Sequence, residues 1–271
     1  MTDPFSVQTL TLVIGRLLPE PHAGLLAGIL FGTKASLSRE LTDSLIATGT
    51  LHIIALSGFN VSIMVGILSD VFIRIFSRRV SSLLILFMLG AFLWFVGVSP
   101  SLVRAVIMGS LSLIAIVFGR QLWSLLSLAL AVIIMLLLNF GWIGEMSFQL
   151  SVLATLGIIL FGGKKPIHSS KSSLLSTLLA DDLRITLAAQ VFTTPLIFFH
   201  FHRLSLISPL TNILIGWLMV PLTVLGGLAS LLGYFWLPLG VIPAWGSWVL
   251  LEYLVRVVSM TAHLPIASVN F

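Results

Sequence analysis

The sequence contains no cysteine, and only 8% of its 271 residues are charged. The absence of cysteine excludes disulfide bonds, thiolate metal sites and cysteine nucleophiles. A soluble domain carries about 25% charged residues, so the low charge excludes an ordinary soluble globular protein. Hydrophobic residues make up 58% of the chain, and the mean hydropathy is +1.15. The composition therefore predicts an integral membrane protein built mostly of helices.

Eight hydrophobic stretches approach the length needed to cross a bilayer, which takes roughly 20 apolar residues. They lie at residues 50–73, 80–98, 100–118, 121–138, 147–162, 184–201, 207–233 and 240–262. The seventh stretch contains Pro209 and Pro221, which predict a kink or a division into two half-spans. The expected fold class is all-α, a polytopic membrane protein with about eight transmembrane helices.

The first 49 residues contain no stretch of that length. Apolar residues recur with helical spacing in residues 5–18, which predicts an amphipathic helix in the membrane interface. Residues 23–31 are apolar but too short to span, so they either dip into the membrane or pack on the helix bundle. Ser38 is expected to cap a third short helix, and Gly49 to end it. The predicted domains are interfacial and short amphipathic helices at residues 1–49 and a transmembrane domain at residues 50–271.

Basic residues predict the orientation of the spans. One set of loops holds Arg74, Arg78, Arg79, Arg120, Lys164, Lys165 and Lys171. Beyond the N-terminal segment, the opposite loops hold only Glu145 and Arg203. Because positively charged residues concentrate in cytoplasmic loops, the first span is expected to run inward. Eight spans then place both termini outside the cytoplasm.

Polar residues interrupt several of these spans. The first span carries His52, Ser57, Gly58 and Asn60 in its first half. Polar groups are costly in hydrocarbon, so they usually face a bundle interior or a water-filled cavity. Later spans carry Gln149, Gln190 and Asn212. Hydrogen bonds between helices explain any one of these amides equally well.

Arg104 is the only basic residue deep in a predicted span, four positions after Pro100. A charge at that depth is expected to face a partner, water or a ligand. The alternative is an arginine that snorkels to the nearby helix start.

Aromatic and basic residues meet at one membrane edge, in Phe199, His200, His202 and Arg203. This set could stack bases and hold phosphates, although an interfacial aromatic belt is the simpler interpretation. Ser57 with either histidine would suit an intramembrane serine hydrolase, in which the imidazole deprotonates the hydroxyl. That signal is weak without a base and an oxyanion site in place. No metal site or cofactor is predicted, because no histidine and glutamate within a span have ligand spacing.

Four stretches follow one another in a recognisable order. The first comprises residues 28–32, Leu37-Ser38 and residues 49–61; the second is residues 100–105, followed by Gly119-Arg120; the third is residues 147–151, with Leu156-Gly157; the fourth is residues 204–212, with Pro221 beyond it. Together they resemble the competence domain of the ComEC/Rec2 family, the inner-membrane channel for DNA uptake. The resemblance covers most of the chain.

The resemblance implies import of single-stranded DNA across the inner membrane during natural transformation. It makes residues 50–271 the channel domain and the polar residues of its spans the candidate lining of the path. Family members often carry an OB-like domain and a metallo-β-lactamase-like domain, and neither is visible in this sequence. The chain itself is therefore expected not to be an enzyme, and separate OB-like, nuclease and ATPase proteins are expected as partners, besides DNA and lipid.

One position departs from the family pattern, because Asn60 stands where the family commonly has histidine. Asparagine cannot carry a proton near neutral pH, so any family role that needs a charged imidazole there is in question. Two other functions remain open: a transporter or channel for another solute on the same scaffold, and the intramembrane serine hydrolase.

Overall fold

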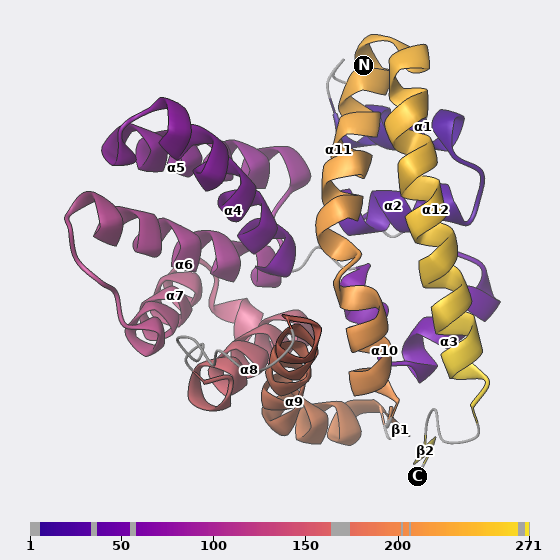
Figure 1. The fold of residues 1–271 in the computed structure, drawn as a ribbon. Coiled ribbons are helices and arrows are strands. Elements are labelled where there is room, and N and C mark those ends of the chain that lie inside the picture. The colour runs from indigo at the N-terminus through magenta and orange to yellow at the C-terminus, as the bar shows by residue number, and fades with distance from the viewer. Residues whose placement is uncertain are drawn as a thin grey trace. The chain divides into compact units, whose positions relative to one another are not determined.

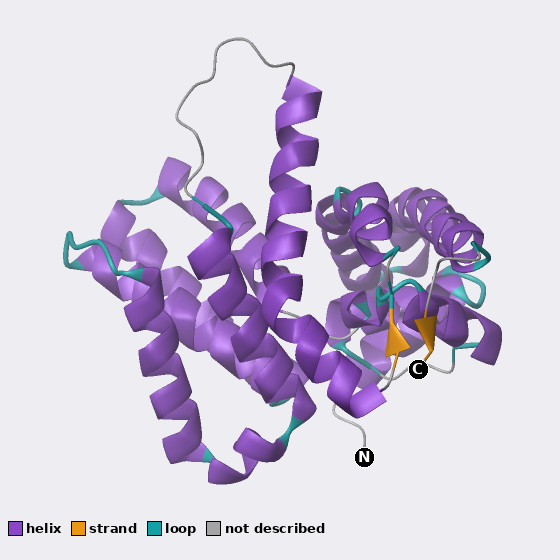
Figure 2. Cartoon of the chain, turned by 90° about the horizontal axis from the view of Figure 1, so that it is seen from below, coloured by secondary structure: helices purple, strands orange, loops and turns teal. Residues whose placement is uncertain are grey.

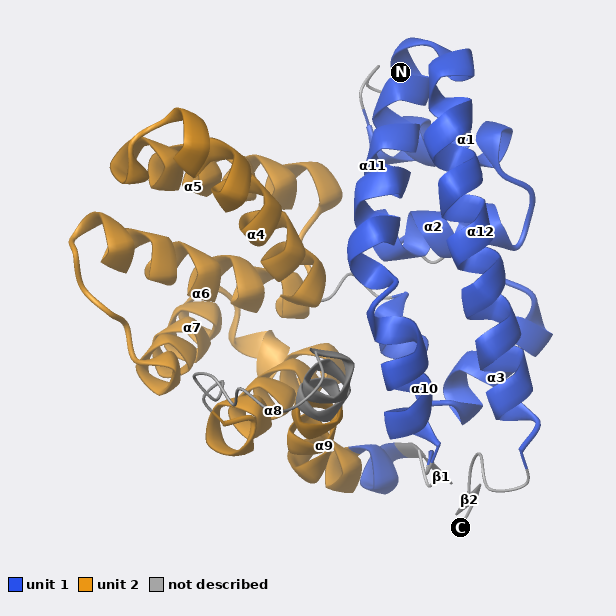
Figure 3. Cartoon of the chain, in the orientation of Figure 1, with its two compact units in different colours: residues 1–56, 197–271 blue, residues 57–196 orange. Residues whose placement is uncertain are grey.

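The computed structural model of the protein describes residues 6–33, 37–54, 58–163, 174–201, 203–205, 207–264 and 269–270. Nearly all of these residues are helical (Figures 1 and 2). The chain divides into two compact units (Figure 3). Unit 1 contains residues 1–56 and 197–271, and unit 2 contains residues 57–196. The all-α fold class is confirmed.

Unit 1 is built around two long helices that are consecutive in the chain, α11 (Met219–Phe235) and α12 (Leu237–Ala262), which lie side by side (Figure 1). The other elements of this unit are α1 (Val7–Leu17), α2 (His22–Phe31), α3 (Arg39–Ala47), the short 3-10 helix η1 (Leu51–Ile53), α10 (Ser208–Gly216), and two strands of two residues each, β1 (Arg203–Leu204) and β2 (Val269–Asn270). The strands pair antiparallel, with Arg203 opposite Asn270.

Helix α2 is the core of unit 1. Every residue from His22 to Leu30 is buried, because α1, α11 and α12 all pack against it. A helix that is apolar on all sides is stable only when it is covered on all sides. Of the two alternatives for residues 23–31, the structure supports packing on the helix bundle.

The other short N-terminal helices also pack within unit 1. Helix α1 buries Leu10, Val13 and Ile14 and packs against α11, so protein covers the apolar face that the sequence assigned to the membrane interface. The predicted ends of the third short helix are confirmed. The Ser38 hydroxyl accepts a hydrogen bond from the Leu41 amide, 3.2 Å, and Gly49 follows α3 with a φ of +66°, which glycine adopts without strain.

Unit 2 contains α4 (Gly58–Ile75), α5 (Arg78–Val96), α6 (Pro100–Val117), α7 (Ser124–Leu138), the 3-10 helix η2 (Phe140–Gly144), α8 (Met146–Phe161) and α9 (Leu174–Phe201) up to residue 196. Helix α6 is central, since it packs against α4, α5, α7 and α8. Val103 of α6, Met135 of α7 and Phe148 of α8 form a buried apolar cluster where three of these helices meet.

The described part of the chain does not support the predicted count of eight spans. Five helices there are long and apolar enough to cross a membrane: α4, α5, α6, α12 and residues 183–200 of α9. Helices α10 and α11, bent by 52°, make a sixth candidate if they form one broken span, which is the break that the sequence predicted. Helices α7 and α8 lie where spans were expected but have only 15 and 16 residues.

The first predicted span also starts later than expected. The continuous helix begins at Gly58, whereas His52 lies in η1. His52 and Asn60, both predicted on the first span, therefore do not lie on one helix. The predicted domain boundary at residue 49 separates interfacial helices from transmembrane helices. It depends on where each segment lies relative to the membrane, so it stays a prediction.

Close packing of α11 on α12 depends on glycine, which gives a test of unit 1. A Cβ at Gly240 would lie 2.8 Å from the Ala229 carbonyl oxygen and 2.8 Å from the Gly233 Cα. These are backbone atoms, so they cannot move without separating the helices. We expect Gly240→Ala to lower the free energy of unfolding by about 1–3 kcal/mol, measured by thermal unfolding of the purified protein in detergent.

Gly227→Ala on α11 is the matched control, because a Cβ at this position meets nothing within 4 Å. Alanine is favoured over glycine in a helix by about 1 kcal/mol, so this variant should unfold at the same or a higher temperature. An equal loss of stability in both variants would contradict the packing described here.

Candidate functional site

The guanidinium of Arg104 lies at the centre of a polar site in unit 2. Pro100 begins α6, where its fixed φ suits the first helical turn. Arg104 follows one turn later and is half-buried. The contacts of its side chain come from α4, α6 and α8.

Two hydroxyls of α8 accept hydrogen bonds from Arg104. Its Nε donates to Ser151 Oγ over 2.8 Å, and its Nη1 donates to Thr155 Oγ1. Ser151 and Thr155 are four residues apart, so they lie on the same face of α8. The Thr155 hydroxyl donates its own hydrogen to the Ser151 carbonyl, 2.9 Å, which leaves its oxygen lone pair directed to the arginine.

Gly58 makes room for the outer end of the guanidinium. A Cβ at this position would lie 2.5 Å from Arg104 Nη2 and 3.2 Å from the Ala105 Cβ. The first residue of α4 is therefore small because the arginine passes beside it. Gly58 and Arg104 were both predicted as site residues, and the structure brings them together.

The positive charge of Arg104 has no carboxylate partner among the described residues, where both salt bridges involve Glu252 of unit 1. The described hydrogen bonds of the guanidinium use Nε and Nη1, so the two N–H groups of Nη2 have no acceptor among the described residues. Neutral hydroxyls solvate an arginine but do not cancel its charge. A guanidinium held in this way can bind an anion.

Sequence reasoning missed Ser151 and Thr155 and assigned Gln149 in their place. The side-chain amide of Gln149 donates to the Ile143 carbonyl, 2.8 Å, and so holds the turn before α8. The hydrogen bonds of Arg104 to α8 go to Ser151 and Thr155, and a role of Gln149 in the path stays a prediction. The sequence did offer a signal for them, because Ser151 and Thr155 are hydroxyl residues four positions apart in a mostly apolar helix.

The remaining predicted residues of unit 2 lie on α4 and α9. Asn60 is buried, with 7% of its surface exposed, and Gln190 is half-buried on α9. Ser57 lies outside the described residues.

A second polar cluster lies in unit 1, where the α3–η1 turn meets the start of α10. Gly49 packs against Ser205 and Ser208, since a Cβ at Gly49 would lie 2.9 Å from Ser208 Oγ. Asn212 Nδ2 donates to the same Ser208 oxygen at 3.5 Å, and its Oδ1 is buried without a donor in the described part of the chain. The first and fourth motif stretches thus meet here.

Side chains of the α3–η1 turn extend this cluster. Thr48 and Thr50 are fully buried and share a hydrogen bond between their hydroxyls, 2.8 Å. His52 Nδ1 lies 2.9 Å from the Gly49 carbonyl oxygen and donates to it when it carries the hydrogen. Within unit 1, predicted residues His52 and Asn212 therefore both lie close to the Gly49 turn.

The aromatic edge at the end of α9 is described in part. Phe199 and His200 are exposed, and Phe199 meets the Phe198 ring edge to face at 6.2 Å. His202 and the side chain of Arg203 lie outside the described residues. Base stacking and an interfacial belt therefore both stay predictions for this edge.

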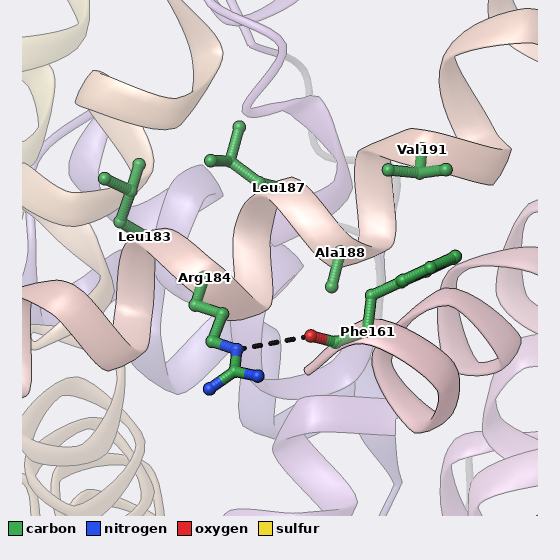
Figure 4. Close-up of a pocket in the computed structure, with 6 residues that line it drawn as sticks. All are labelled: Phe161, Leu183, Arg184, Leu187, Ala188 and Val191. Atoms are coloured by element: carbon green, nitrogen blue, oxygen red, sulfur yellow. Dashed lines mark hydrogen bonds between the residues drawn. The ribbon is translucent and has the colours of Figure 1, made fainter. Parts of the chain in front are cut away.

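A shallow apolar groove follows α8 and α9 in unit 2 (Figure 4). It is lined by Phe161, Leu183, Arg184, Leu187, Ala188 and Val191. Arg184 Nε donates to the Phe161 carbonyl at 3.3 Å, which places a cation at the C-terminal end of α8, where the helix dipole favours it. The groove offers one charged group on an apolar wall and is not a polar path. Among the described residues, no three His, Asp or Glu side chains are grouped to hold a metal ion.

The comparisons with known proteins agree with this arrangement of motifs. A family model described as Competence protein matches residues 29–271, which includes both polar clusters. The chain is 29% identical over 206 residues to ComE operon protein 3 of Bacillus subtilis (strain 168), covering 76% of the chain and 25% of that protein. The chain thus spans about a quarter of the length of this curated relative. No solved structure matches.

The contribution of the hydroxyl partners of Arg104 can be measured as a change in the free energy of unfolding. Thr155→Val removes an acceptor from a half-buried cation, and a hydrogen bond to a charged group contributes about 1.5–3 kcal/mol. We expect a loss of that size in the unfolding free energy measured in detergent. In an Arg104→Met background the same substitution should have little effect, because the charge is gone.

Thr193→Val on α9 is the matched control, because within the described part of the chain the Thr193 hydroxyl bonds only the Ala189 carbonyl of its own helix, 3.0 Å. Thr193→Val should lower the free energy of unfolding much less than Thr155→Val does. If Thr155→Val costs the same with and without Arg104, the two side chains do not depend on one another.

Proposed function

Because the chain belongs to the competence protein family, we propose that it forms an inner-membrane channel that imports single-stranded DNA during DNA uptake. Family membership supports a role in DNA uptake for competence. The chain is a multi-helix membrane protein. The channel, its single-stranded cargo and its orientation are our proposals.

The observation that carries the proposal is the uncompensated charge of Arg104. Three of its N–H groups are held by Ser151, Thr155 and the sulfur of Met108. The Nη2 group remains to bind a phosphate oxygen, and a charge-assisted hydrogen bond is stronger away from bulk water. A single fixed charge attracts each phosphate in turn without holding the strand, as permeation requires.

The polar residues predicted from the sequence would give the strand a hydrated path. In unit 2 we assign Gly58, Asn60, Gln149 and Gln190 to this path together with Arg104. In unit 1 we assign His52 and Asn212, and we include Ser57 from the sequence. Exposed Phe199 and His200, with His202 and Arg203, would stack bases and hold phosphates at the edge.

The chain would act without enzymatic activity or a cofactor of its own. Strand degradation and pulling of the DNA would be the work of separate proteins with OB-like, nuclease and ATPase domains. A transporter of another solute and a serine hydrolase that uses Ser57 are the competing functions, and the experiments below distinguish them.

The expected orientation places both termini outside the cytoplasm. The six candidate spans, counting the bent pair as one, are an even number, and the count stays even if α7 and α8 cross together. The basic residues at positions 74–79 and 164–171 would then face the cytoplasm.

Arg104 variants test the channel. Arg104→Gln keeps length and polarity but removes the charge, so uptake of labelled single-stranded DNA into proteoliposomes should fall steeply at matched protein abundance. Arg104→Lys keeps the charge but not the fork of donors, and we expect intermediate uptake. Arg120→Gln changes an exposed arginine and should leave uptake unchanged.

Parent-like uptake by both Arg104 variants would remove Arg104 from the path. Flux of small anions without DNA uptake would favour the solute transporter. Labelling of Ser57 by a fluorophosphonate probe, lost in Ser57→Ala, would favour the hydrolase.

Topology is tested by reporter fusions at Phe271 and Lys165. The fusion at Phe271 should report the extracytoplasmic side and the fusion at Lys165 the cytoplasmic side, because positive loops stay inside. A cytoplasmic signal at Phe271 would rule out the proposed orientation.

A further inference from the structure

Three ionisable side chains form a second charged centre, in unit 1. His22 Nε2 lies 3.0 Å from Glu252 Oε2, and Arg256 Nε donates to Glu252 Oε1 over 2.7 Å. Trp248 lies beside the imidazole, with ring centroids 5.7 Å apart. His22 is the first residue of the buried helix α2, whereas the other three residues lie on α12.

Glu252 lies far from both ends of α12. It is 15 residues from Leu237 and 10 residues from Ala262, or about 22 Å and 15 Å along the axis at 1.5 Å per residue. Helix α12 is one of the candidate spans. A carboxylate in the middle of a span is costly and usually belongs to a pathway for ions, protons or substrate.

Holding α2 in place does not explain this centre. Helix α2 is already covered on all sides by apolar contacts, and a buried ion pair is often no more stable than apolar residues of similar volume. His22 Nδ1 is also buried without a hydrogen-bond partner among the described residues. Buried polar atoms that serve structure alone are normally paired.

We propose that His22 and Glu252 form a proton-binding site. In the unloaded state the neutral imidazole donates its Nε2 hydrogen to the Glu252 carboxylate, and Nδ1 keeps a free lone pair. A proton then binds at Nδ1 and leaves from the same atom. Glu252 stabilises the imidazolium. Arg256 binds the same carboxylate and therefore weakens the attraction between Glu252 and the protonated ring. The proton can then leave again.

Loading changes the net charge of His22, Glu252 and Arg256 from zero to plus one. Other charged groups on the elements that pack against α2 and α12 are exposed at the surface of unit 1. They are Arg16, Glu20, Arg39, Glu40 and Asp43. Helices α10 and α11 contain no Asp, Glu, Lys, Arg or His. The Glu20 carboxylate accepts a hydrogen bond from the Gly24 amide at the start of α2, 3.1 Å, so the proton responds to Glu20 as well as to Glu252 and Arg256.

The role that we assign to this site rests on the proposed function, the import of DNA. An incoming strand carries negative charge toward an interior that is itself negative, so the membrane potential opposes its entry. A proton that enters through unit 1 compensates for that charge. Proton loading at His22 would therefore promote DNA passage when the outside is acidic.

The first experiment tests the proton site without DNA. Nitrogen NMR of labelled histidine, in the full chain in nanodiscs, follows the six histidines, and His22→Gln assigns the signal. The ring of His22 should change reversibly between its neutral and protonated forms as the pH is changed. At one intermediate pH the protonated fraction should rise in Arg256→Gln and fall in Glu252→Gln. A ring that keeps one form throughout, or variants that shift it in the same direction, would overturn the proposal.

The second experiment tests the coupling. Uptake of single-stranded DNA into proteoliposomes should increase when the outside is acidic, and His22→Gln should lose most of this dependence. His263→Gln, at an exposed histidine just after α12, should keep it. If DNA uptake by the unmodified protein does not change with the pH gradient, the proposed coupling is overturned. If the parent imports no DNA at all, the proposed function fails, whereas the NMR titration still decides the proton site.

Discussion

A charged side chain within a membrane bundle must find its hydrogen-bond partners inside the protein, and the organisation of unit 2 follows from this constraint. Arg104 lies on the central helix α6, and α8 supplies Ser151 and Thr155 to receive two of its donors. Helix α4 begins with Gly58, which leaves space for the third nitrogen. Residues from three of the four motif stretches, Gly58, Arg104 and Ser151, thus meet at one cation.

The two charged centres of the molecule differ in how their charge is balanced. Arg104 is surrounded by neutral hydroxyls and keeps its full positive charge, which suits an anion that comes and goes. Glu252 is bound on one side by Arg256 and on the other by His22, so its charge is balanced within the protein. The two ligands that we propose, a phosphate at Arg104 and a proton at His22, carry opposite charges.

Small residues and apolar packing hold these centres in position. In unit 1, Gly233 and Gly240 let the backbones of α11 and α12 approach closely, as small residues do between membrane helices. The same hairpin covers α2 and holds His22 against α12. In unit 2, a Cβ at Gly157 would collide with the Ala188 carbonyl oxygen, which shows how closely α8 approaches α9.

The sequence by itself determined the all-α membrane class, the approximate positions of most helices, the cap at Ser38 and the break between α10 and α11, and it singled out Arg104 as a candidate. These features depend on composition and on contacts within a few residues, which the chain order specifies. Only the tertiary structure decided that Arg104 meets Ser151 and Thr155 instead of Gln149, that His52 lies outside the first long helix, and that His22 meets a glutamate 230 residues away. Such pairings depend on how each helix is rotated and crossed by its neighbours, and periodicity along one helix does not contain that information.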